Sequence, residues 1–104
     1  MHEAHPMPAK TLSHKDFEKL VDDEFVATSE AGERLVLRLQ SVEQTGEGPK
    51  GHRDPFSLIF HEDGHAHLPQ QTHSVEHEKL GAIDIFLVPL GPDADGMRYE
   101  AVFG

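Results

Sequence analysis

The feature that most constrains the fold is a period-two alternation of apolar side chains in short runs that end at turn-forming residues. Leu35, Leu37 and Leu39 occupy alternate positions of one such run, with Val36 and Arg38 between them. Alternation of this kind places every second side chain on one face of a β-strand. One face is then available for a core, while the other meets solvent.

Runs of this kind recur along the whole chain, over residues 24–28, 35–40, 56–61, 72–77, 83–88 and 97–103. Turn-forming residues separate them, and the longest turn-rich segment spans residues 44–54. The runs follow one another in hairpin-like order without intervening helices, which argues against a parallel sheet. Both faces of the run at 83–88 are apolar, so we expect this strand to be covered on both sides. We expect Pro89 to end its regular pairing, because proline has no N–H to donate.

One short helix is expected before the first strand. Ser13 and Asp16 fit a capping box. Phe17, Leu20 and Val21 then follow at i, i+3, i+4 spacing and form one apolar stripe. About nine residues do not hold a helix alone, so this helix must dock on the sheet. We therefore predict a mainly β fold, at the margin of α+β: a small antiparallel β-barrel or sandwich of about six strands, with one short N-terminal helix over an open end or seam.

The length and composition indicate one domain. The chain has 104 residues and no Cys, which excludes disulfides, thiolate metal sites and Cys nucleophiles. We expect residues 1–12 to form an extended or flexible lead and residues 13–104 to form the single β domain. No apolar run approaches the roughly 20 residues of a membrane-spanning helix. The N-terminus also lacks the basic and apolar regions of a signal peptide, so a cytoplasmic location is expected.

The charge balance is strongly acidic. Nineteen Asp and Glu against nine Lys and Arg give a formal net charge of −10, with the nine His counted as neutral. Such a chain repels phosphate backbones and anionic lipid, so we expect neither nucleic acid nor membrane as a partner. Arg34 and Arg38 share one strand face, but they are too few to make a nucleic-acid footprint.

Histidine is concentrated between positions 61 and 77. Five of the nine lie in this stretch, and they are His61, His65, His67, His73 and His77. Neutral imidazole is a good ligand for zinc, copper or nickel. The spacing matches no closed structural zinc motif, so two interpretations stay open: histidines solvated at the surface, or a weak, adventitious site for a divalent transition metal. No other cofactor is expected.

Carboxylates provide two further candidates for a functional site. Residues 93–96 resemble part of a calcium loop, but the remaining ligand positions are missing and a hairpin turn is the better interpretation. Asp84 is the one carboxylate within the apolar run 83–88, and three interpretations stay open: it is buried, it faces solvent, or it blunts an edge strand. The chain has no nucleophile elbow, phosphate loop, dinucleotide fingerprint or zincin helix, so we do not expect an enzyme.

Three segments of the chain are distinctive: Pro-Phe-Ser-Leu-Ile-Phe at 55–60, Leu-Pro-Gln at 68–70, and the stretch 86–103. They resemble a family of small bacterial proteins, the domain of unknown function 6916. The predicted helix within residues 12–21 is similar to the helix with which its members open. The resemblance covers nearly the whole chain, but it implies no established activity, cofactor or catalytic residue. Of the histidine cluster, only His77 fits the family's pattern.

These observations predict a non-catalytic protein-interaction or accessory structural module. Residues 86–89 are too apolar to be left exposed. If Pro89 places them near a sheet edge, that edge accepts a strand from another protein or from a second copy of the chain; alternatively, the helix stripe covers them. Two other functions stay open. One is a component or assembly factor of a phage-tail-like apparatus, which the resemblance implies, and the other is a small metal-dependent enzyme that uses the histidine cluster.

Overall fold

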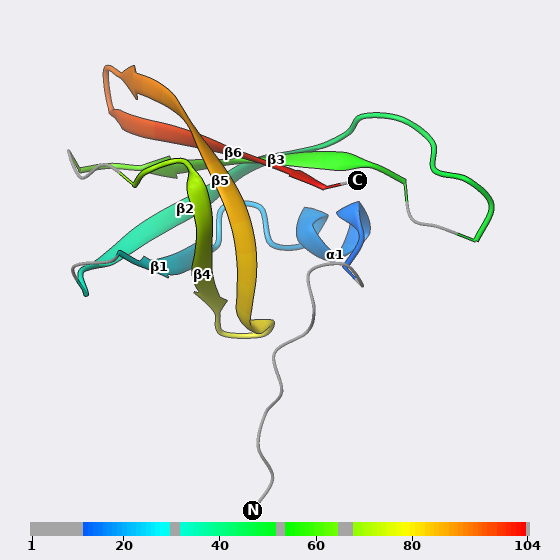
Figure 1. Ribbon diagram of the computed structural model, residues 1–104, viewed down its shortest axis with the longest axis horizontal. Helices are drawn as coiled ribbons and strands as arrows, with labels where there is room; N and C mark the ends of the chain where they lie inside the picture. Colours follow the sequence, from blue (N-terminus) through cyan, green and yellow to red (C-terminus); the bar gives the residue numbers. More distant parts are fainter. Residues whose placement is uncertain (1–11, 30–31, 52–53, 65–67, 104) are drawn as a thin grey trace, which may run out of the picture.

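Figure 1 shows a computed structural model of the protein, in which six antiparallel strands form a closed barrel. The structure describes residues 12–29, 32–51, 54–64 and 68–103. The elements are α1 (His14–Glu18), β1 (Glu24–Thr28), β2 (Arg34–Gln44), β3 (Phe56–Glu62), β4 (Gln71–His77), β5 (Gly81–Asp93) and β6 (Gly96–Phe103). The predicted mainly β fold with one short helix is confirmed. The choice left open between barrel and sandwich is resolved in favour of the barrel.

The strands lie around the barrel in the order β1-β2-β3-β6-β5-β4, and β4 pairs with β1 to close it. Most strands that follow one another in the chain are neighbours in this order. The exception is the connection from β3 to β4, because these two strands lie on opposite sides of the barrel. Leu68 of this connection is fully buried, and its backbone N–H donates to the Tyr99 hydroxyl at 3.0 Å. The crossing connection therefore contributes to the core.

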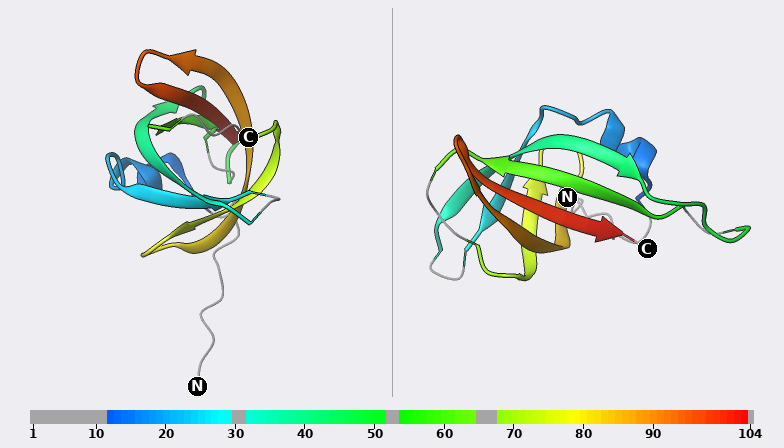
Figure 2. Two further views of the ribbon diagram at one scale, coloured as in Figure 1. Left: turned by 90° about the vertical axis from the view of Figure 1, so that its left-hand side faces the viewer. Right: turned by 90° about the horizontal axis from the view of Figure 1, so that it is seen from above.

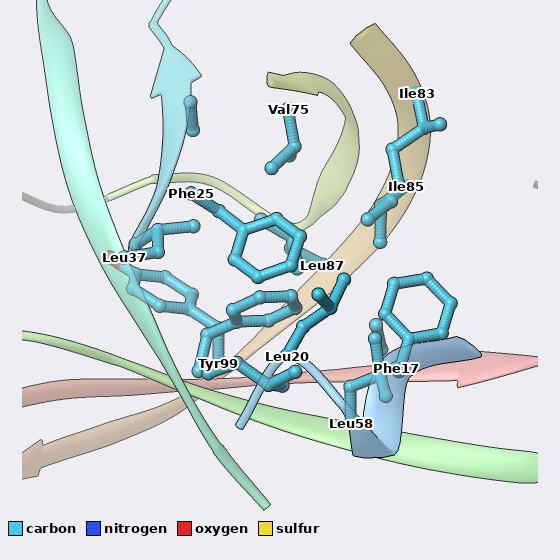
Figure 3. Packing of buried hydrophobic residues seen from close by; sticks show 14 of the residues in the cluster. Phe17, Leu20, Phe25, Leu37, Leu58, Val75, Ile83, Ile85, Leu87 and Tyr99 are labelled. Atoms are coloured by element: carbon cyan, nitrogen blue, oxygen red, sulfur yellow. The ribbon is translucent and has the colours of Figure 1, made fainter. Parts of the chain in front are cut away.

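Alternate residues of each strand point into the barrel and form a single core. On β6 the inward residues are Met97, Tyr99, Ala101 and Phe103, as the alternation predicts. Figure 3 shows buried side chains from β1, β2, β4 and β5 converging on those of β6 and α1. Full burial of one large apolar side chain contributes on the order of 2 kcal/mol, so this core is the main source of stability.

The helix α1 lies beside one end of the barrel (Figure 2). The Asp16 carboxylate accepts a hydrogen bond from the backbone N–H of Ser13 at 2.8 Å, as expected of a capping box. The Phe17 ring lies 5.8 Å from Phe56 and 5.6 Å from Phe103, measured between centroids. The rings of Phe56 and Phe103 stack at 4.6 Å. These contacts place α1 where β3 begins and β6 ends, so the helix covers an end of the barrel.

β5 corrects three sequence expectations. It continues through Pro89 to Asp93, because a register shift between Pro89 and Gly91 lets the ladder resume beyond the proline. Its outer face is not covered, since α1 packs on the barrel end and Phe86 stays 49% exposed. The expected sheet edge is also wrong, because β5 pairs with β4 on one side and with β6 on the other.

The barrel closes at a short seam between β1 and β4. Only two residue pairs join these strands, namely Val26 with Glu76 and Ala27 with Val75. Each of the other neighbouring pairs of strands shares five or more. His77 supports the seam from β4, since its ring lies 4.6 Å from that of Phe25 on β1.

We predict that Gly96 tolerates no side chain. Its φ is +147°, and a Cβ there would overlap the backbone carbonyl oxygen of Glu62. Gly96→Ala is expected to lower the free energy of unfolding by about 3 kcal/mol, measured by chemical denaturation. Gly51→Ala is the matched control, because φ is +87° and nothing lies within 4 Å of its Cβ. We expect the control to lose only about 1 kcal/mol; equal losses would show that the contact with Glu62 is unimportant.

Candidate functional site

The described members of the histidine cluster lie in three separate places, each with its own partner. His61 is at the end of β3, with Nε2 3.4 Å from Asp93 Oδ1. His73 on β4 directs Nε2 at the backbone carbonyl of Pro69, 2.8 Å away. His77 lies at the seam between β4 and β1. The three side chains are 4%, 4% and 5% exposed, so the interpretation as solvated surface histidines is wrong for them.

These positions do not assemble into one metal centre. His73 and His77 share the inward face of β4, but four strand residues span about 13 Å. Within the described ranges, no group of three or more His, Asp or Glu side chains is arranged to hold a metal ion. His65 and His67 lie outside the described residues, so a metal site that includes them stays a prediction.

Both ring nitrogens of His77 are engaged. The backbone N–H of Lys79 donates to Nδ1 at 3.0 Å, so Nδ1 acts as an acceptor and carries no proton. Nε2 therefore carries the proton and donates to Asp23 Oδ2 at 2.8 Å. Asp23 comes just before β1, so this hydrogen bond joins the two sides of the seam. The arrangement is structural, because the ring is fixed by a backbone donor on one side.

An open groove of about 610 Å³ lies beside the seam, and we call it the acidic groove. It is lined by Asp22, Asp23, Glu24, Val26, Glu76, His77, Glu78 and Lys79. Five carboxylates against one ammonium group make its potential negative. Such a surface attracts cations in general, but none of its lining residues offers a buried, unpartnered atom that would select one ligand.

A second open groove, of about 400 Å³, lies where β1 and β2 meet the end of β3. It is lined by Glu24, Arg34, Leu35, Val36, Arg38, His61, Glu62, Asp63 and Gly64. Nδ1 of His61 and Oε1 of Glu62 are buried and lack a hydrogen-bond partner; Asp63 Oδ1 lies 3.0 Å from Nδ1, outside hydrogen-bond geometry. His61 and Glu62 are consecutive residues at the end of β3, so their side chains start from opposite faces of the strand, although both line this groove.

The acidic candidates from the sequence are surface groups. The backbone N–H of Asp95 donates to Asp93 Oδ1 at 2.9 Å and holds the pKa of Asp93 below its usual 3.8; partial burial opposes this shift, and His61 adds to it. Residues 93–96 thus form the hairpin turn that we preferred over a calcium loop. Asp84 is exposed on the outer face of β5, which is not an edge strand.

Tyr99 is the one buried phenol of the core. Burial raises its pKa above the usual value of 10.0. The hydrogen bond from the Leu68 N–H partly opposes this increase, and the negative charge of Glu62 adds to it. The hydroxyl is therefore held in its neutral form, in which its oxygen accepts from the backbone of the crossing connection.

Apolar side chains gather on the outer face of β3, β6 and β5. Ile59, Glu100 and Val88 form one cross-strand row over these strands. Val102 and Phe86 lie two residues further along β6 and β5, towards the same end because the strands are antiparallel. Val102 is 65% and Phe86 49% exposed, while the row of three is partly buried. We call these five residues the outer patch.

The charged neighbours of the outer patch on β2 and β5 are acidic, while on β6 Arg98 lies two residues before Glu100 on the same face and pairs with Asp93. Ser57 pairs with Val102 on one side and with Glu43 on the other, so Glu43 lies at the β2 border. Asp84 comes two residues before Phe86 on β5. Sequence reasoning singled out residues 86–89 as a binding segment, but at a sheet edge that β5 does not have, and it missed the contributions of β3 and β6. The two-faced apolar run 83–88 was assigned to a strand covered on both sides.

Tyr99 gives a pH-dependent prediction, because it is the only Tyr and the chain has no Trp. With its folded-state pKa above the unfolded value, stability is unaffected below pH 10 and falls as the pH rises above it. We predict that phenolate absorbance appears later on the pH scale than in urea-unfolded protein. Tyr99→Phe should lose this alkaline dependence and about 1–3 kcal/mol of stability, since the Leu68 N–H loses its acceptor. Coincident titrations of folded and unfolded protein would contradict this.

His77 gives a second prediction. Long-range ¹H–¹⁵N spectra at neutral pH should show a protonated Nε2 and an unprotonated Nδ1. Asp23→Ala should lower the free energy of unfolding by about 1–2 kcal/mol, because the Nε2–H loses its acceptor. Glu78→Ala removes a neighbouring carboxylate of the same groove and should have little effect. A proton on Nδ1, or equal losses in both variants, would disagree with the structure.

Comparison with known proteins identifies a family. The family described as domain of unknown function DUF6916 has a model that matches residues 12–103. No curated protein and no solved structure matches the chain significantly. In the described part of the chain, no helix has the length and apolar character needed to cross a membrane. The match extends over most of the chain, and the protein therefore belongs to the DUF6916 family.

Proposed function

We propose that the protein is a non-catalytic interaction module that docks a partner protein on the outer patch. The main support is the exposure of Phe86 and Val102, which lie two residues beyond the paired Val88 and Glu100 towards the same end, on a barrel whose other large apolar side chains mostly point inward. Contiguous exposed apolar surface of this kind marks interaction sites, and aromatic side chains are enriched in interface cores. The partner would bind to the face of the sheet, since β5 has no free edge.

A catalytic role has weaker support. General acid–base chemistry needs titratable groups that converge in a cleft. His77 has one nitrogen occupied by a backbone donor and the other by Asp23. His61 is held at the β5–β6 turn by Asp93. We therefore propose no reaction at either histidine.

A second copy of the chain is a poor occupant for the outer patch. Glu43, Asp84 and Glu100 lie in or beside it, and the nearby Arg98 is already paired with Asp93, so a face-to-face dimer would bring mainly acids close to those of the other copy. The net charge of −10 on each copy adds long-range repulsion. A different protein that carries apolar side chains fits this surface better.

The docking proposal is tested by site-specific photo-crosslinking in cells that naturally make the protein. A photoreactive residue in place of Val102 is expected to give one defined adduct, which disappears when Phe86→Asp is added. The same residue in place of Val36, which is 48% exposed on β2 outside the patch, is the control. An equal adduct from position 36, or an adduct that survives Phe86→Asp, would reject the outer patch as the docking surface. Circular dichroism should confirm that Phe86→Asp folds.

A further inference from the structure

Glu100 lies at the centre of the outer patch. In its cross-strand row it has Ile59 of β3 on one side and Val88 of β5 on the other. Val102 follows it on the same face of β6 and is largely exposed. Any partner that covers Phe86 and Val102 will therefore also cover, or lie against, this carboxylate.

Among the described residues Glu100 takes part in no ion pair, and Arg98, two residues before it on the same face, pairs with Asp93 at 3.7 Å. The ion pairs of the described residues involve the carboxylates of Glu18, Asp23, Asp63 and Asp93 instead. Covering an unpaired carboxylate with an apolar surface removes its hydration and opposes binding. An acidic partner would add repulsion from Glu43 and Asp84. Only a partner that brings a positive charge to Glu100 gains from both the apolar and the charged parts of the patch.

We infer that the occupant of the outer patch is a basic segment of the partner protein, in which an Arg or Lys pairs with Glu100. This inference rests on the proposed docking function. Arg and Lys side chains lay their methylene stems along apolar surface and keep the charged end at a polar group. Phe86 and Val102 supply that surface, and the Phe86 ring can also face the cation. The negative net charge of the chain draws such a segment towards it.

The test compares two acetylated peptides of equal length, one of alternating Leu and Arg and one of alternating Leu and Glu. They are titrated into the full, isotope-labelled chain and followed by amide chemical shifts. The Leu-Arg peptide is expected to shift the resonances of Phe86, Val88, Glu100 and Val102, and the Leu-Glu peptide is expected to leave them unchanged. Both peptides carry the same apolar content, so the difference reports the charge requirement.

Substitutions distinguish local pairing of the peptide with Glu100 from attraction of the peptide by the net charge of the chain. Glu100→Gln is expected to weaken binding of the Leu-Arg peptide about fivefold. Glu78→Gln removes the same charge from the acidic groove and should change binding less than twofold. Glu100→Lys should reverse the preference, so that the Leu-Glu peptide binds at the outer patch.

Two outcomes would overturn the inference. Equal weakening by Glu100→Gln and Glu78→Gln, or shifts centred on the acidic groove, would mean that net charge alone attracts the peptide. Binding of both peptides at the outer patch with no effect of Glu100→Gln would reject the basic occupant, while docking at the outer patch would stand. Failure of the docking function itself is recognised separately, by the crosslinking at position 102.

Discussion

Closure of the sheet between β1 and β4 is the constraint on which the rest of the structure depends. An open six-stranded sheet would expose two edges and leave its inward side chains without an opposite wall. The closing strands share only two residue pairs, and the hydrogen bond from His77 to Asp23 adds a link beside them. A buried histidine suits this position, because its two nitrogens bond to the turn after β4 and to the segment before β1.

Much of the fold could be predicted because the alternation of apolar residues is local information. It placed all six strands and their inward residues. Closure could not be predicted, since the pairing of Val26 with Glu76 joins residues far apart in the sequence and leaves no local pattern. The helix cap could also be predicted from local sequence, whereas the length of the helix could not. The stripe continues to Val21, yet the chain leaves the helix at Glu18 and turns through a positive φ at Asp22.

The site was harder to predict because closeness in sequence differs from closeness in space. His61 and His77 are near each other along the chain, but β3 and β4 lie on opposite sides of the barrel. Asp23, the hydrogen-bond partner of His77, is 54 positions away in the sequence, and no sequence pattern indicated that the two residues meet. The outer patch did leave a signal in the two-faced run 83–88. Its exposure depended on where α1 docks, and the rings of Phe56 and Phe103 draw the helix to the barrel end.

Along β6, residues that fill the core alternate with residues that form the outer surface. Tyr99 and Ala101 face the core, while Glu100 and Val102 face outward between and beside them. Substitutions at the outward positions can change which partner binds to the barrel without opening a cavity in the core. A scaffold built in this way can acquire new binding preferences by changes at alternate positions while the barrel itself stays the same.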